Sequence, residues 1–159
     1  MVFDSIGSYI VIPAIAGASL VPGPLFGFSK LIMRPLAELT PEHGMVAMQQ
    51  IKKILNPLFL VFFLGTPILC LMITGYCLFH LNIAHSVYLL LGSIGYIIGP
   101  FGITVRRNIP LNDKVAAAQP MDRSEVWDHY QVNWQRCNHI RTYIGLGSIM
   151  LLCVGLRIA

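Results

Sequence analysis

The longest uncharged stretch of the chain, Ile54–Val105, runs for 52 residues without a single Asp, Glu, Lys or Arg. A second uncharged stretch of 24 residues covers Ile6–Ser29. A helix needs roughly 20 apolar residues to cross the hydrocarbon core of a bilayer, so these stretches hold about three spans. Only 11% of the residues are charged, against about 25% in soluble domains. These features exclude a soluble protein and predict an integral membrane protein.

The hydropathy pattern predicts an all-α membrane protein, in which a bundle of four transmembrane helices forms one domain over residues 1–159. The predicted spans are about 6–33, 54–79, 83–105 and 139–157, separated on one side by segments of about 34–53 and 106–138. Pro22 and Pro24 remove backbone donors, so we expect a kink or a break in the first helix. Gly95 and Gly99 have the small-residue spacing that lets membrane helices approach closely.

Two of the helices are expected to extend beyond the membrane. Thr40-Pro41-Glu42 combines a capping hydroxyl, a proline at the first helical position and an acid in the first turn, so the second helix should begin near Pro41. Asp122 and Glu125 have capping-box spacing and predict the start of the fourth helix. Both helices therefore have cytoplasmic extensions in this prediction.

Basic residues gather at one end of the predicted spans. Ten of the 11 Lys and Arg residues lie in or beside the segments between spans 1 and 2 and between spans 3 and 4, whereas only Arg157 lies opposite. The positive-inside rule then predicts that both long loops are cytoplasmic and both termini are outside. The net charge of +4 could suggest nucleic acid as a partner, but Lys and Arg lie at the ends of the spans rather than on a soluble face. The expected partner is therefore the bilayer. The sequence leaves a homo-oligomer open.

Five residues form one stripe on the fourth helix. Trp127, Tyr130, Trp134, Asn138 and Arg141 are spaced 3, 4, 4 and 3 apart, which places them on one face. The aromatics alone also fit a membrane-interface belt. Polar side chains entering a span usually face the bundle interior and mark a site, so the stripe indicates either a functional pocket or a structural polar cluster.

Two further polar groups lie at the same end of the bundle. Asn108 and Asn112 directly follow the third span, and Gln49 and Asn56 lie on the helix that enters the second span. Because both groups are expected at the membrane edge where the stripe lies, we predict that all three contribute to one pocket.

These residues together resemble the anthrone oxygenase family. The resemblance rests on Asn108-Ile-Pro-Leu-Asn112-Asp113, on Trp127-x-x-Tyr-x-x-x-Trp134-x-x-x-Asn138-His139-x-Arg141, on Met33-x-Pro35-Leu36, on Met48-Gln49-x-Ile51 and on Asn56-Pro57-x-Phe59 with Phe62. It covers about residues 15 to 157. The sequence departs from the family pattern at Lys52, where an Asn is expected.

The resemblance implies a small four-helix membrane oxidoreductase, a monooxygenase that oxidises polyketide anthrones to anthraquinones with dioxygen. Such chemistry needs a flat aromatic slot, a base and donors for an enolate oxygen. We expect the catalytic residues to be His139 as base, with Asn138, Arg141 and Trp134. The expected substrate-binding residues are Trp127, Tyr130, Asn108, Asn112, Gln49 and Asn56. The expected partner is a small aromatic substrate, O₂ is the co-substrate, and neither a cofactor nor a metal is predicted.

Two other functions remain open from the sequence. The histidines, His43, His80, His85, His129 and His139, are numerous enough to hold haem, copper or iron in a membrane oxidoreductase. On an ideal helix His139 lies about 100° from Asn138, so it can also face lipid headgroups. Alternatively, the chain is a non-enzymatic membrane protein that binds a lipid, quinone or pigment. The four cysteines form no CxxC motif and are typical of core positions.

Overall fold

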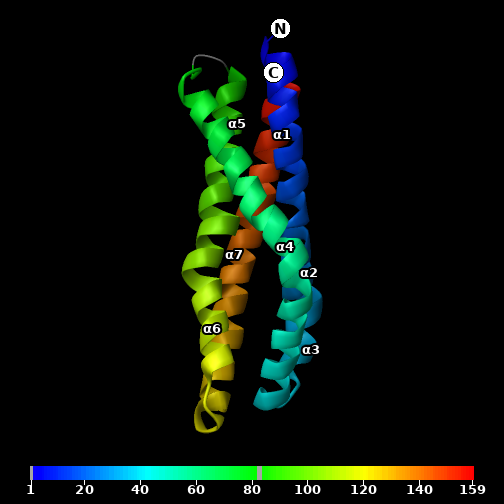
Figure 1. Ribbon diagram of the computed structural model, residues 1–159, viewed down its shortest axis with the longest axis vertical. Coiled ribbons are helices and arrows are strands. Elements are labelled where there is room, and N and C mark those ends of the chain that lie inside the picture. Colours follow the sequence, from blue (N-terminus) through cyan, green and yellow to red (C-terminus); the bar gives the residue numbers. More distant parts are fainter. Residues whose placement is uncertain (1, 82–83) are drawn as a thin grey trace.

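The computed structural model is an all-helical bundle of four rods, and it describes residues 2–81 and 84–159, except the side chains of residues 2–8, 56 and 58 (Figure 1). The first rod consists of α1 (Val2–Leu20), α2 (Pro22–Gly27), the π-helix η1 (Phe28–Ile32) and α3 (Met33–Ala37). The second is α4 (Pro41–Leu78). The third consists of α5 (Ala84–Tyr96), the π-helix η2 (Ile97–Asn108) and α6 (Ile109–Ala117). In the fourth, the short 3₁₀ helix η3 (Pro120–Asp122) leads into α7 (Arg123–Arg157).

The predicted four-helix membrane architecture is confirmed. Four helical segments are long and apolar enough to cross a bilayer, namely Tyr9–Ala37, Phe59–Leu78, Ala84–Ala117 and Pro120–Arg157. No β-strand occurs within the described parts of the chain. The chain is thus a multi-pass membrane protein.

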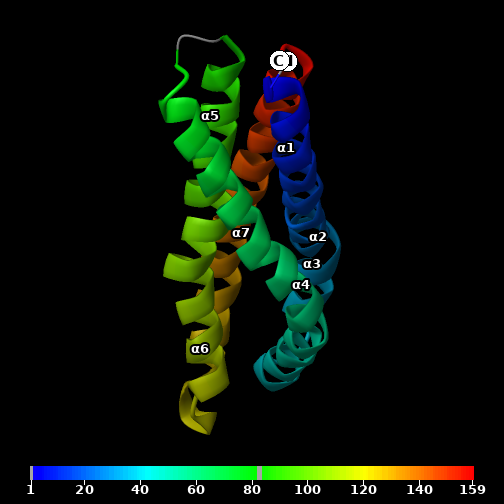
Figure 2. The same cartoon turned by 45° about the horizontal axis from the view of Figure 1, so that its top comes forward.

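The rods cross rather than run strictly side by side. Both chain ends lie at the same end of the bundle, and α3, the start of α4 and α6 lie toward the other (Figure 1). From there α4 slants across the bundle until its C-terminal part lies beside α5 (Figures 1 and 2). The long helix α7 contacts all three other rods. Polar side chains on α7 are therefore placed to bind partners from every other part of the bundle.

The first rod breaks where the prolines predicted a break. Helix α1 ends at Leu20 and α2 begins at Pro22, which has no N–H to donate to the preceding turn. The ring of Pro22 and the ring of Pro100 both lie against Gly145 of α7, where a Cβ atom would come within 2.6 Å of Pro22 Cγ and 2.9 Å of Pro100 Cγ. The absent side chain at Gly145 therefore lets three rods meet.

The spacing of the glycines in the third span predicted close packing against another helix, and the structure shows that this helix is α7. A Cβ atom at Gly99 would overlap the side chain of Ile144, and one at Gly95 would overlap the hydroxyl of Ser148. Small residues allow this close approach because they place little side-chain volume between two helix backbones. The third and fourth rods are consequently packed tightly along this stretch.

Helices α4 and α7 both extend past their predicted spans, and the segments 34–53 and 106–138 are themselves mostly helical. Helix α4 begins at Pro41 as expected, but Thr40 does not cap it; its hydroxyl shares a hydrogen bond of 3.0 Å with His43 Nδ1. Arg123 Nη1 donates to Glu42 Oε1 over 2.6 Å. This exposed ion pair joins the N-terminal ends of the two long helices.

Two π-helical segments widen the backbone in the middle of the bundle. In η2 the Thr104 hydroxyl donates to the Pro100 carbonyl over 2.6 Å, and Pro100 itself has no N–H. In the first rod, η1 begins at Phe28. Departures of this kind from the α-helix are frequently found at functional sites. Both segments contribute residues to the cavity described below.

The close packing at Gly145 predicts a difference between two neighbouring alanine substitutions. Gly147 lies on the same helix and has open space where a Cβ atom would be. Gly147→Ala should stabilise α7 by up to about 1 kcal/mol through helix propensity. Gly145→Ala should instead destabilise the bundle by about 1–3 kcal/mol, because two rigid proline rings must shift. Thermal unfolding in detergent measures both changes, and equal midpoints for the two variants would contradict the packing.

Candidate functional site

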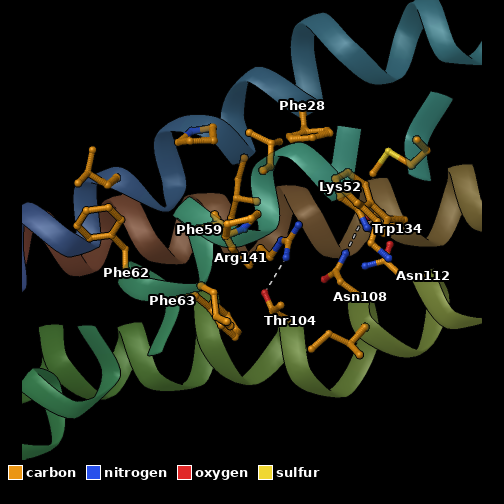
Figure 3. Close-up of a pocket in the computed structure, with 18 of the residues that line it drawn as sticks. Phe28, Lys52, Phe59, Phe62, Phe63, Thr104, Asn108, Asn112, Trp134 and Arg141 are labelled. Carbon is orange, nitrogen blue, oxygen red and sulfur yellow. Dashed lines mark hydrogen bonds between the residues drawn. The ribbon is translucent and has the colours of Figure 1, made fainter. Parts of the chain in front are cut away.

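A cavity of about 730 Å³ lies between residues 20–28 of the first rod, residues 48–63 of α4, η2 with α6, and α7 (Figure 3). Apolar side chains make up most of its wall. The lining residues are Leu20, Pro24, Leu25, Phe28, Met48, Lys52, Leu55, Pro57, Phe59, Leu60, Phe62, Phe63, Thr104, Asn108, Ile109, Asn112, Asp113, Trp134 and Arg141. A few polar groups in an otherwise apolar cavity are typical of small-molecule sites.

Five aromatic rings contribute to the apolar wall, together with aliphatic side chains. The ring centroids of Phe28 and Trp134 are 5.5 Å apart, and those of Phe59 and Phe63 are 5.6 Å apart with nearly parallel planes. Phe62 lies on the same helix as Phe59 and Phe63 (Figure 3). Flat aromatic molecules pack favourably against such rings in offset or tilted arrangements. The cavity is thus suited to a flat, largely apolar ligand.

Arg141 is the most buried charged group of the cavity, with 3% of its surface exposed. Its Nε and Nη2 donate to Asn138 Oδ1 over 3.1 and 2.7 Å, and its Nη1 donates to Thr104 Oγ1 over 2.6 Å (Figure 3 shows the latter bond). The guanidinium carbon lies 5.2 Å from the centre of the Trp134 ring, a cation–π contact. Arg141 is therefore held in one orientation by two neutral partners and one ring.

Asn138 is fully buried and accepts hydrogen bonds from Arg141 on the side away from the cavity. Its Nδ2 donates to the Leu25 carbonyl over 2.7 Å and to Ser29 Oγ over 2.6 Å, while its Oδ1 accepts both bonds from Arg141. Asn138 is not a lining residue itself. It ties α7 to the first rod at the point where η1 begins, and this tie positions the guanidinium.

No carboxylate within the described residues lies at ion-pair distance from Arg141. The other charged lining residues are Lys52 on α4 and Asp113 on α6. Burial lowers the pKa of the Lys52 ammonium below its ordinary value of 10.5, and the negative charge of Asp113 partly offsets this effect. The cavity consequently holds two cationic side chains and one carboxylate.

Asn108 and Trp134 are lining residues with polar atoms that lack partners. Asn108 Nδ2 donates to the Trp134 carbonyl over 3.4 Å, but its Oδ1 has no hydrogen bond, and neither has Trp134 Nε1. Asn112 Oδ1 accepts a bond of 2.9 Å from the Tyr130 hydroxyl. A buried polar atom without a partner costs about 1–3 kcal/mol, and Asn108 Oδ1 and Trp134 Nε1 are both fully buried rather than open to the cavity.

The structure brings together four of the residues expected at the site, since Trp134, Arg141, Asn108 and Asn112 all line the cavity. Asn138 lies behind them. Four others are not lining residues, namely Trp127, Tyr130, His139 and Gln49. Asn56 lies on α4, and its side chain is outside the described residues.

The residues that do not line the cavity have other surroundings. Trp127 and Tyr130 are buried and stacked, with ring centroids 5.5 Å apart, in a core cluster with Met45 and Met48. His139 is half-buried on α7, with no hydrogen-bond partner for its Nε2, and Gln49 is exposed. The base role expected of His139 stays a prediction, and the geometry does not bring its ring to the cavity.

Several lining residues were not expected as site residues. On α4, Met48, Lys52, Leu55, Phe59 and Phe62 are spaced 4, 3, 4 and 3 apart and form one face of the helix. This spacing could have been found by the same periodicity that revealed the stripe on the fourth helix. Nothing in the sequence around Thr104 or Phe28 marks them as partners of the cavity, because their role depends on tertiary contacts.

The five histidines are candidate metal ligands by residue type. Within the part of the chain that the structure describes, no three His, Cys, Asp or Glu side chains are grouped so that they could hold a metal ion.

The fold and the cavity define a four-helix membrane protein with an aromatic pocket whose polar wall is built around a buried arginine. The family model of anthrone oxygenases matches residues 58–151, more than half of the 159 residues. The chain belongs to the anthrone oxygenase family. No curated protein and no solved structure matches it significantly. The matched region contains Arg141, Trp134 and Asn138, whereas Lys52 lies outside it.

The shared hydrogen bonds of Asn138 and Arg141 predict strong energetic coupling. Asn138→Ala leaves a buried cation without its main acceptor, and Arg141→Ala leaves Asn138 Oδ1 unpaired, so each should destabilise the protein by about 1–3 kcal/mol or more. The double variant should cost less than the sum, with a coupling of about 0.5–3 kcal/mol. Denaturant unfolding in detergent measures this cycle. Ile140→Ala on the exposed face is the control, and additive costs would contradict the network.

Proposed function

We propose that this chain is an oxygenase of the anthrone oxygenase type that oxidises a flat aromatic, polyketide-like substrate with O₂. Membership of the family and the aromatic cavity beside buried Arg141 support this proposal. The cavity volume of about 730 Å³ lies within the range of about 300–1,000 Å³ found for small-molecule sites. The observation that most supports the proposal is that Arg141 is a buried cation held in place at the cavity wall.

The proposed reaction needs no redox group in the protein. A base removes one proton from a CH₂ group that is conjugated through two aromatic rings to a carbonyl, and the electron pair delocalises onto the carbonyl oxygen. The carbanion carbon then gives two electrons to O₂ as a C–O bond forms, and protonation yields a hydroperoxide. Loss of the second C–H proton with cleavage of the O–O bond leaves a new carbonyl and releases water. One oxygen atom enters the product and the other enters water.

The lining residues fit distinct roles in this sequence. Arg141 lines the cavity, and its guanidinium can stabilise negative charge on the substrate oxygen, which lowers the cost of removing the proton. Among the lining residues, Asp113 is the carboxylate that can accept that proton. Because Asp113 is exposed, it can then release the proton to solvent. We therefore propose Asp113 as the base in place of His139, which does not line the cavity. Metal and haem have no step in this proposal.

Oxygen consumption with emodin anthrone tests the function. Arg141→Lys keeps the charge but loses the planar fork that binds Asn138 and Thr104. Because it removes fixed donors at a developing oxyanion, turnover should fall by about 10²–10³-fold. Asp113→Asn should also lower turnover, whereas Trp127→Phe, outside the cavity, should leave it nearly unchanged.

Other results would redirect the proposal. Binding of the anthrone without oxygen uptake would favour a carrier. A stoichiometric metal or a Soret band in the active preparation would reject the cofactor-free mechanism. Loss of activity in His139→Ala, together with full activity in Asp113→Asn, would return the base role to His139.

We further propose that both chain ends face outside and that the connection between α6 and α7 is cytoplasmic, because 10 of 11 basic residues gather at that end. In a variant without native cysteines, Gln119→Cys should resist a membrane-impermeant maleimide in intact cells and react after lysis. Ala159→Cys, at the opposite end of the bundle, is the matched control and should react in intact cells. The reverse labelling pattern would invert the proposed topology.

A further inference from the structure

Arg141 is a buried cation whose partners are all neutral. Asn138 and Thr104 accept three of its hydrogen bonds, and Trp134 supplies a ring face. A guanidinium carries five N–H groups, so two of them have no hydrogen-bond acceptor among the described residues. Charged groups within membrane spans are expensive and are normally paired. The polar wall of the cavity therefore lacks the anion that would balance this charge.

A second cation lies at the same cavity. Lys52 of α4 is half-buried and lines it, with Asp113 as its carboxylate neighbour. In Figure 3, Lys52 lies near Trp134 on the side of Asn108, and Arg141 lies on the side of Phe59. One carboxylate against two cations leaves the lining with a net positive charge. Its neighbour Lys53 is exposed and is not a lining residue.

The two cations of the wall match an acidic ligand. Trp134 Nε1 and Asn108 Oδ1 also lack partners, but both atoms are fully buried and do not face the cavity. An anionic oxygen can accept bonds from the two N–H groups of Arg141 that have no acceptor among the described residues. The phenyl rings on the other wall would pack against the apolar body of the same molecule.

We propose that the cavity binds its ligand as an anion, an aromatic molecule whose carboxylate or ionised phenol pairs with Arg141 and with Lys52. The inference rests on the proposed function only for the aromatic body of the ligand. The inference adds that the ligand already carries a negative charge when it binds. In the proposed oxidation alone, the anthrone would become negatively charged only when the base removes its proton. A neutral aromatic molecule of the same shape should bind more weakly.

Two fluorescent probes with one ring system test this inference without oxygen chemistry. They are 8-anilinonaphthalene-1-sulfonate, which is anionic, and N-phenyl-1-naphthylamine, which lacks the sulfonate. In a Trp127→Phe background Trp134 is the remaining tryptophan, so energy transfer from it reports probe in the cavity, with protein-free micelles as the blank. The anion should bind at least about tenfold more tightly than the neutral probe, as expected for charge-assisted hydrogen bonds.

Substitutions at the two cations should remove this preference. Arg141→Gln should lower the affinity for the anionic probe by about tenfold and leave the neutral probe unchanged. Lys52→Asn should lower the affinity for the anionic probe by a smaller factor. Because Lys52 is only half-buried, this variant is expected to fold, so it tests the inference even where Arg141→Gln does not fold. Lys53→Asn removes the same charge outside the cavity and is the matched control.

The possible outcomes separate this inference from the proposed function. Equal affinities for the two probes, or equal effects of Lys52→Asn and Lys53→Asn, would overturn the anion site. Selective anion binding by a protein that consumes no oxygen would reject the oxygenase and keep the anion site. Oxygenase activity with no preference for the anionic probe would reject the anion site and keep the oxygenase.

Discussion

The burial of one guanidinium is the constraint on which the rest of this site depends. Arg141 lies within a membrane-spanning helix, where an unsolvated charge is tolerated only when neighbouring groups replace water. Asn138 and Thr104 do so from two directions, and Trp134 covers one face. Because both hydrogen-bond partners are neutral, the charge is held in place without being cancelled. The guanidinium of Arg141 can then bind an anionic group of a ligand or an intermediate without changing its orientation.

The irregular helices of the bundle serve this arrangement. Asn138 reaches the carbonyl of Leu25 and the hydroxyl of Ser29 in the first rod, just after the break at Pro22. Thr104, whose hydroxyl binds Arg141, belongs to the π-helical segment that contains Pro100. In the first and third rods, the π-helical segments thus contribute residues to the cavity, and glycine at 145 allows three rods to meet.

The sequence revealed part of the site because helical periodicity is a local property. The stripe on the fourth helix does share one buried face, from Trp127 to Arg141. The face nevertheless has two roles, since Trp127, Tyr130 and Trp134 pack into one core cluster, whereas Trp134 and Arg141 also line the cavity. Which neighbour covers each turn of a stripe depends on where the other rods cross it, and periodicity carries no information about that.

The sequence by itself determined the membrane class, the four long helices, the break in the first rod and the face of the fourth helix that is buried. Each of these follows from charge spacing, prolines or side-chain periodicity over neighbouring residues. Only the tertiary structure decided which residues enclose the cavity and that none of the described carboxylates lies beside Arg141. The reason is that these facts depend on contacts between distant parts of the chain, such as the hydrogen bond from Asn138 to Leu25 across 113 positions.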